Sequence, residues 1–196
     1  MKVNNEITLR IKGDMEQFKK TLKEKGYEEK EQFILYDVFM VPENLELDKM
    51  TTREIISKAI IIRKVEDITK NEIRRDISYK IKKFNDNGEI LEQKSIRLKI
   101  LSCEDAEKFM EAIGYKKLMN IVEKDYVYEK DGFSLATKEV IGGDNMIEAE
   151  TEIDNENLNT IDKLKAKLEQ ENMPLDFKDC FVKKAEVELN KILGRE

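Results

Sequence analysis

Polar and apolar residues alternate through the stretch NMIEAETEI, residues 145–153, and this pattern constrains the fold more than any other feature of the chain. Successive side chains of a β-strand point to opposite faces, so Glu148, Glu150 and Glu152 would share one face. The other face would carry the residues between them, Ile147, Ala149, Thr151 and Ile153. The three carboxylates would then form either the solvated face of a sheet or a binding site for a cation.

The same alternation recurs along the chain. The segments expected to form strands are 3–12, 31–41, 57–67, 74–84, 89–100, 120–130, 133–140 and 145–153. Helices are expected between Asp14 and Gly26, between Ser102 and Gly114, from Asn157 to a break at Pro174, and near 179–193. The stretch 43–55 is expected to be a loop or a short helix, and NDNG at 85–88 a hairpin turn. The pattern predicts one α+β domain over residues 1–196, with strands within about 3–153 and a helical segment at about 156–193.

Charged residues line one face of many of these strands. The rows are Glu6/Thr8/Arg10/Lys12, Ser78/Lys80/Lys82, Gln93/Ser95/Arg97/Lys99, Glu123/Asp125 and Glu148/Glu150/Glu152. In an ordinary antiparallel sheet these rows would meet water. In a closed antiparallel barrel with helices outside, they would line a wet lumen that could bind a metal ion and a polyanion together. The pattern alone leaves both arrangements open.

Composition excludes several classes of chemistry. The chain has no histidine, which removes Ser/His and Cys/His nucleophile systems and imidazole acid–base chemistry. Any catalysis must use carboxylates, Lys, Arg, Tyr or a hard metal ion, and carboxylate oxygens favour Mg²⁺, Mn²⁺ or Ca²⁺ over zinc. No glycine-rich phosphate loop precedes a helix, which argues against P-loop and dinucleotide-binding folds.

Charge and cysteine content indicate the setting of the protein. A net charge of −6 argues against general nucleic-acid binding and against adhesion to anionic membranes. No apolar run reaches the length of a membrane span, and the stretch MKVNNEITLR has no signal-peptide apolar core. Cys103 and Cys180 lack metal-ligand spacing and are expected to be free thiols of a reducing cytosol. We therefore expect a cytoplasmic protein with no nucleic-acid partner and no membrane partner.

Five short motifs follow one another along the chain. They are EITLR at 6–10, YDVFMVP at 36–42, AIIIRK at 59–64, ISYK at 77–80 and GGDNMIEAE at 142–150. Their order resembles that of the CYTH superfamily, also called triphosphate tunnel metalloenzymes, which includes class IV adenylate cyclases, thiamine-triphosphatases and inorganic triphosphatases. The resemblance covers residue 4 to about residue 152. It implies a single CYTH-like domain, a closed eight-stranded antiparallel β-barrel braced by external helices, which binds a triphosphate and a divalent metal ion inside.

The resemblance also assigns roles to individual residues. The carboxylates that match the family's metal ligands are Glu6, Glu148 and Glu150. The basic residues that match its phosphate-binding residues are Arg10, Arg63 and Lys80. Mg²⁺ or Mn²⁺ is the implied cofactor, and no catalytic residue is assigned apart from these two sets.

Some positions depart from the family's pattern. In the best register they are Thr8, Ile61, Arg97, Glu123, Asp125 and Lys138. Several of them invert the charge, since Arg97 and Lys138 stand where acidic residues are usual, and Glu123 and Asp125 stand where basic residues are usual. The departures are compatible with a rewired tunnel that keeps its charge balance, and with a tunnel that no longer does the chemistry.

The function favoured by the resemblance is a metal-dependent hydrolase of inorganic triphosphate, thiamine triphosphate or a nucleoside triphosphate. Adenylate cyclase activity is less favoured, because no purine pocket can be identified. The alternative is a non-catalytic tunnel that binds a polyphosphate, nucleotide or other phosphorylated ligand, and a third reading is a barrel whose lumen charges pair with one another. The expected partner is a small-molecule triphosphate or polyphosphate. The C-terminal helices would either brace the barrel or form a homodimer contact.

Overall fold

The computed structural model describes residues 6–84, 90–152 and 155–195, with the backbone alone at 82–84 and 90–93. Four sequence predictions lie outside these residues: the start of the first strand at 3–5, the hairpin turn at 85–88, the strand start at Glu89 and the strand end at Ile153. Within the described ranges, no helix is both long enough and apolar enough to cross a membrane. Cys103 and Cys180 are free thiols.

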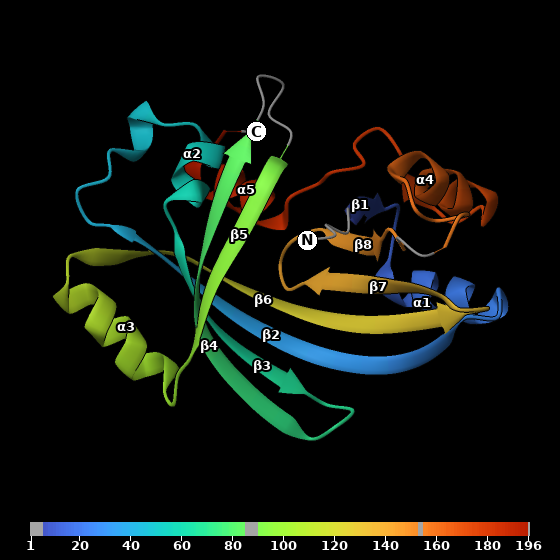
Figure 1. Ribbon diagram of the computed structural model, residues 1–196, viewed down its shortest axis with the longest axis horizontal. Coiled ribbons are helices and arrows are strands. Elements are labelled where there is room, and N and C mark those ends of the chain that lie inside the picture. The colour runs from blue at the N-terminus through green and yellow to red at the C-terminus, as the bar shows by residue number, and fades with distance from the viewer. Residues whose placement is uncertain (1–5, 85–89, 153–154, 196) are drawn as a thin grey trace. The chain divides into compact units, whose positions relative to one another are not determined.

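Antiparallel strands dominate the structure. They are β1 (Glu6–Ile11), β2 (Glu28–Pro42), β3 (Ile60–Asp67), β4 (Glu72–Phe84), β5 (Ile90–Lys99), β6 (Tyr115–Lys130), β7 (Phe133–Val140), β8 (Asn145–Glu150) and β9 (Leu175–Asp176). Their hydrogen-bonded order is β5-β4-β3-β2-β6-β7-β8-β1-β9 (Figure 1). The predicted α+β class with a large antiparallel sheet is confirmed. For the residues that the structure describes, hydrogen bonds do not close this order into a ring, so the closed eight-stranded barrel remains a prediction.

Five α-helices accompany the strands in the described residues. They are α1 (Met15–Glu24), α2 (Thr52–Ser57), α3 (Cys103–Ala112), α4 (Ile161–Gln170) and α5 (Lys184–Leu193), and a 3-10 turn covers Leu47–Lys49. The predicted caps of the first two long helices are present. The Asp14 carboxylate accepts a hydrogen bond from the Gln17 N–H at 3.0 Å, and the Ser102 hydroxyl accepts one from the Asp105 N–H at 3.1 Å.

The chain divides into two compact units, and the first consists of Met1–Phe33 and Glu123–Lys184. It contains β1, β7, β8, β9, α1 and α4. Its core joins the apolar face of the strands to both helices, through buried side chains such as Leu9, Phe18 and Leu164. Because β-strand side chains alternate, the charged rows of β1 and β8 lie on the face opposite to this core.

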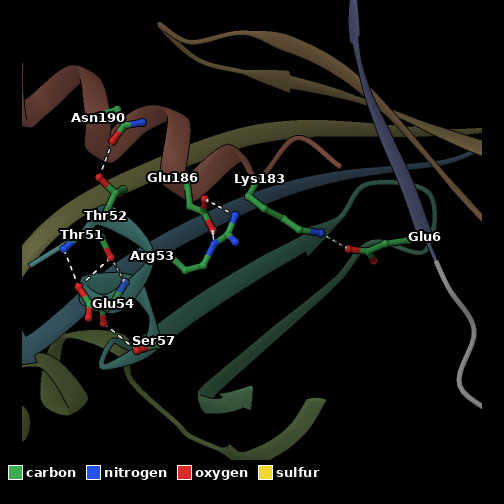
Figure 2. A network of polar contacts seen from close by, with 9 residues as sticks. All are labelled: Glu6, Thr51, Thr52, Arg53, Glu54, Ser57, Lys183, Glu186 and Asn190. Atoms are coloured by element: carbon green, nitrogen blue, oxygen red, sulfur yellow. Dashed lines mark hydrogen bonds and ion pairs between the residues drawn. The ribbon is translucent and has the colours of Figure 1, made fainter. Parts of the chain in front are cut away.

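The second unit consists of Ile34–Val122 and Ala185–Glu196. In its core, α3 contributes the buried Met110, which packs with Met40 of β2 and Ile62 of β3. The C-terminal helix α5 contacts α2 through the ion pair of Arg53 with Glu186 and through a hydrogen bond that the Thr52 hydroxyl donates to Asn190 (Figure 2). The single domain expected over residues 1–196 stays a prediction.

Several strand ends differ from the sequence predictions. β2 begins at Glu28 instead of residue 31, and β6 begins at Tyr115 instead of residue 120. These additional residues are rich in Glu and Lys and carry little alternation, so the period-2 signal is weak there. β3 begins at Ile60 instead of residue 57, because α2 continues to Ser57 behind a capping box formed by Thr51 and Glu54.

The C-terminal region differs more. The last helix begins at Lys184 instead of near residue 179. Residues before it are extended, since the Cys180 carbonyl accepts a hydrogen bond from the Thr8 N–H and the Val182 N–H donates one to the Thr8 carbonyl. The two-residue strand β9, which pairs with the end of β1, was not predicted, because so short a segment has no measurable periodicity.

Candidate functional site

Three carboxylates from two neighbouring strands converge in the first unit. In the antiparallel pairing of β1 with β8, Glu6 lies opposite Glu150 and Thr8 lies opposite Glu148. One carboxylate oxygen from each of Glu6, Glu148 and Glu150 lies within 4.8 Å of the other two. We call these three residues the acidic triad. The structure thus brings together the three residues predicted to bind a metal ion, while their role as ligands remains a prediction.

The donor set of the acidic triad suits a hard divalent cation. All three ligands offered are carboxylate oxygens, which are the donors that Mg²⁺ and Mn²⁺ prefer. Glu6 and Glu150 are exposed and Glu148 is half-buried, so the oxygens can be approached from solvent. Like charges this close repel one another, and a divalent ion would relieve that repulsion. The residues present therefore fit the metal ion that the resemblance implies.

A buried network of ion pairs continues from the acidic triad on the same face. Lys138 of β7 lies opposite Asp125 of β6, and its ammonium nitrogen is 3.1 Å from Asp125 Oδ2 and 3.6 Å from Glu148 Oε2. Lys184 donates a hydrogen bond to Glu123 Oε1. Glu123 is 1% exposed and Asp125 7% exposed, so this part of the charged row does not meet water. The solvated-face interpretation of the Glu123/Asp125 row is therefore wrong.

The charges of this network determine its protonation. Burial, opposed by Lys138 and reinforced by Glu123, raises the pKa of Asp125 to about 6. Burial by itself would lower the pKa of Lys138, but Asp125, Glu123 and Glu148 raise it above its ordinary value. Burial also raises the pKa of Glu148. The carboxylates of this network are those of Glu123, Asp125 and Glu148, and its ammonium groups are those of Lys138 and Lys184. Among the described residues, Glu123 Oε2 and Asp125 Oδ1 are buried without a hydrogen-bond partner. The network therefore favours additional positive charge.

Arg10 is the one predicted phosphate-binding residue that lies in the first unit. It follows Glu6 and Thr8 on the same side of β1, and its Nε donates a hydrogen bond to Asp144 Oδ2 at 2.8 Å. Both side chains are partly exposed, at 39% and 32%. An ion pair this accessible contributes little to stability, so Asp144 does not fix the guanidinium firmly in place.

Arg63 and Lys80, the other two predicted phosphate-binding residues, lie in the second unit. Arg63 of β3 makes a bidentate pair with Asp37 of β2, with both N–O distances at 2.5 Å, and the Asp37 side chain is 1% exposed. Lys80 of β4 is half-buried and lies opposite Ser95 of β5. By the strand register, Arg63 and Lys80 occupy the same face of β3 and β4, opposite to the apolar face that packs against α3.

Sequence reasoning missed four charged partners of the charged residues that it singled out. They are Asp37, Asp144, Lys183 and Lys184. Asp37 is surrounded by apolar and aromatic residues in YDVFMV, and a carboxylate within such a run is the signal that could have found it. Lys183 and Lys184 follow an irregular segment and carry no periodic signal, so only the fold reveals their partners.

Solved structures share the fold of this chain, although its sequence matches no known family. No protein-family model matches the sequence, and a search of curated proteins found no match. Among solved structures, however, the chain shares its fold with proteins described as candidate adenylate cyclases.

Three of these structures are similar over almost the whole chain. The PH1819 protein from Pyrococcus horikoshii OT3 is 16% identical, with a TM-score of 0.64 over 98% of this chain and 100% of the other. HpAC1 from Hippeastrum, a candidate adenylyl cyclase described as having a dominant triphosphatase activity, is 13% identical, with a TM-score of 0.55 over 90% and 91%. A candidate adenylate cyclase from Vibrio parahaemolyticus is 13% identical, with a TM-score of 0.52 over 90% and 94%.

Proposed function

We propose that this protein is a metal-dependent hydrolase of triphosphate-containing substrates, which it binds in a tunnel formed by closure of its antiparallel sheet. The observation that carries the proposal is the acidic triad, whose carboxylate oxygens converge within 4.8 Å on a fold shared with a protein described as a triphosphatase. Inorganic triphosphate, thiamine triphosphate and nucleoside triphosphates share the phosphate tail that such a site would bind. Mg²⁺ or Mn²⁺ is the proposed cofactor.

Each predicted residue has a defined part in this proposal. A divalent ion held by Glu6, Glu148 and Glu150 would neutralise phosphate charge and lower the pKa of a bound water. The guanidinium of Arg10, exchanged from Asp144, would bind a phosphate oxygen next to the acidic triad. Arg63 and Lys80 would stabilise the charge that develops on the phosphate oxygens during transfer.

Arg63 fits this part in a specific way. Its bidentate bond to the buried Asp37 fixes the plane of the guanidinium, while the Arg63 side chain remains 21% exposed. A guanidinium has five N–H donors, and the bond to Asp37 uses Nε and one terminal nitrogen. Asp37 would therefore be a positioning residue for Arg63.

The proposal assigns metal binding to Glu148 and phosphate binding to Lys80. Glu148 belongs to the first unit and Lys80 to the second. Phosphate release from tripolyphosphate, ATP and thiamine triphosphate should be measured with Mg²⁺ or Mn²⁺ for the wild type, Glu148→Gln and Lys80→Ala. Metal-dependent release that both substitutions reduce by about 10²-fold or more is expected, because each removes a charge that stabilises the transition state.

Matched controls separate site effects from general loss of charge. Glu129 of β6 and Lys108 of α3 are exposed. Glu129→Gln and Lys108→Ala should leave release unchanged. If Glu148→Gln abolishes release and Lys80→Ala does not, the two residues do not act at one site, and the tunnel part of the proposal is wrong.

A second function, binding without turnover, is favoured by one observation. Basic side chains of both units already have acidic partners, as in Lys138 with Asp125 and Arg63 with Asp37. A site whose charges are largely balanced can hold a ligand and yet stabilise a transition state poorly. Absence of release from all three substrates, together with thermal stabilisation by tripolyphosphate that Lys80→Ala removes, would establish a binding tunnel instead of a hydrolase.

A further inference from the structure

Two consecutive lysines place their ammonium groups on the acidic face of the first unit. Lys183 Nζ lies 3.3 Å from Glu6 Oε1, and Figure 2 shows its extended side chain reaching this carboxylate. Lys184 donates a hydrogen bond to Glu123. Glu6 belongs to the acidic triad, and Glu123 belongs to the buried network of ion pairs.

The backbone before these lysines is anchored to β1. The Thr8 N–H donates a hydrogen bond to the Cys180 carbonyl at 3.0 Å, and the Val182 N–H donates one to the Thr8 carbonyl at 3.2 Å. The Val182 side chain is 3% exposed. Thr8 is two residues from Glu6, so this anchoring holds Lys183 beside Glu6, and the Lys183 side chain can move without any change in the backbone.

The two ion pairs differ in how easily they can be broken. The side chains of Lys184 and Glu123 are 19% and 1% exposed, and a carboxylate so deeply buried is costly to leave without its cation. The side chains of Lys183 and Glu6 are 25% and 47% exposed. An ion pair of that kind contributes little because water solvates both partners when they separate. The ion pair of Lys184 with Glu123 is therefore expected to persist, whereas the ion pair of Lys183 with Glu6 can dissociate.

We propose that Lys183 is a tethered cation that neutralises Glu6 while the acidic triad holds no metal ion, and that a divalent ion displaces its ammonium group. This inference rests on the metal site of the proposed function. When a Glu6 oxygen binds a divalent ion, the ion repels the Lys183 ammonium group, because both are positively charged. The ion pair of Lys183 with Glu6 is then less favourable than it is without the ion. Lys183 therefore weakens metal binding and sets the metal concentration at which the acidic triad fills.

Calorimetric titration of the full chain with Mn²⁺ tests this competition. Lys183→Gln should bind Mn²⁺ about two- to fivefold more tightly than the wild type, the range expected for release of an exposed ion pair. The matched control is Lys178→Gln, which changes the net charge equally at an exposed position of the same segment and should leave the affinity unchanged. Glu150→Gln should weaken Mn²⁺ binding strongly, because it removes one carboxylate of the acidic triad.

A chemical readout on the wild-type protein distinguishes displacement from simple repulsion. Lysine acetylation, quantified by mass spectrometry with and without Mn²⁺, should rise at Lys183 on metal binding and stay constant at Lys178. Suppose that Glu150→Gln weakens Mn²⁺ binding. If Lys183→Gln then leaves the affinity for Mn²⁺ unchanged, or if acetylation of Lys183 does not rise with Mn²⁺, the proposed competition between Lys183 and the metal ion is wrong, while the proposed metal site stands. If Mn²⁺ does not bind, or Glu150→Gln leaves its affinity unchanged, the proposed metal site fails and the competition fails with it.

Discussion

Replacement of Lys138 by methionine is the perturbation that tests the buried network most sharply. The Lys138 side chain is 14% exposed and its partner Asp125 10% exposed, so water cannot take over the role of the ammonium group. Methionine keeps the length and the apolar contacts of the lysine stem. Loss of one member of a buried ion pair costs about 3–5 kcal/mol, so Lys138→Met should lower the free energy of unfolding by about that amount at pH 8.

The pH dependence of this loss follows from Asp125. Its pKa is already raised to about 6, and removal of the nearest cation raises it further. A carboxyl group whose pKa is raised in the folded state destabilises the fold progressively as pH rises from its unfolded pKa to its folded pKa, by about 1.4 kcal/mol for each pH unit between the two values. The cost of Lys138→Met should therefore fall to roughly half at pH 5, where the folded-state carboxyl is protonated.

Urea unfolding of the wild type and the variant at pH 5 and pH 8 measures both quantities. The double variant Lys138→Met/Asp125→Asn should recover a large part of the stability at pH 8, because it removes the uncompensated charge. A cost below about 1 kcal/mol at pH 8, in the range of solvated surface pairs, would refute the conclusion that the network is buried. An equal cost at both pH values would refute the assignment of the pH dependence to Asp125.

Substitutions at three positions, Arg63, Asp125 and Asp14, provide further tests. Arg63→Met should cost about 3–5 kcal/mol in urea unfolding, because Asp37 would keep its buried charge without the guanidinium, and Arg63→Lys should recover only part of this. Between about pH 4 and pH 6 the wild type should lose stability as pH rises, because the pKa of Asp125 is raised in the folded state. Asp125→Asn should remove most of this pH dependence of stability. Thermal melts at a series of pH values measure it. Asp14→Ala should cost about 1 kcal/mol in urea unfolding, because it removes the side chain that accepts the Gln17 N–H at the start of α1.

Alternation within single segments was enough to predict most strands. In β8 the side chains alternate as predicted: Ile147 and Ala149 are buried in the core, and Glu148 and Glu150 lie on the opposite face. Burial of one face of a strand against helices imposes this strict period of two. The caps at Asp14 and Ser102 act within three residues, so the sequence displays them directly. Strand ends rich in Glu and Lys were missed, because hydrogen bonding to neighbouring strands extends them without any apolar pattern.

The acidic triad was predictable because its members come from two motifs, one on each of two strands. What the sequence could not provide was the set of partners. Lys183 lies far from Glu6 along the chain, and they meet only because the segment before Lys183 pairs with β1 at Thr8. Long-range ion pairs depend on topology, which short-range patterns do not encode. For the same reason the sequence left open whether Glu123 meets water or lies buried.

The most direct test of the central claim is a ³¹P NMR time course of tripolyphosphate with Mg²⁺ and the wild-type protein, repeated with Glu150→Gln and with the exposed-carboxylate control Glu129→Gln. The account predicts conversion to pyrophosphate and orthophosphate by the wild type and by Glu129→Gln, and loss of conversion on removal of Mg²⁺ or in Glu150→Gln. Conversion that Glu150→Gln leaves undiminished, or tripolyphosphate that stays intact with the wild type at every Mg²⁺ concentration, would contradict it.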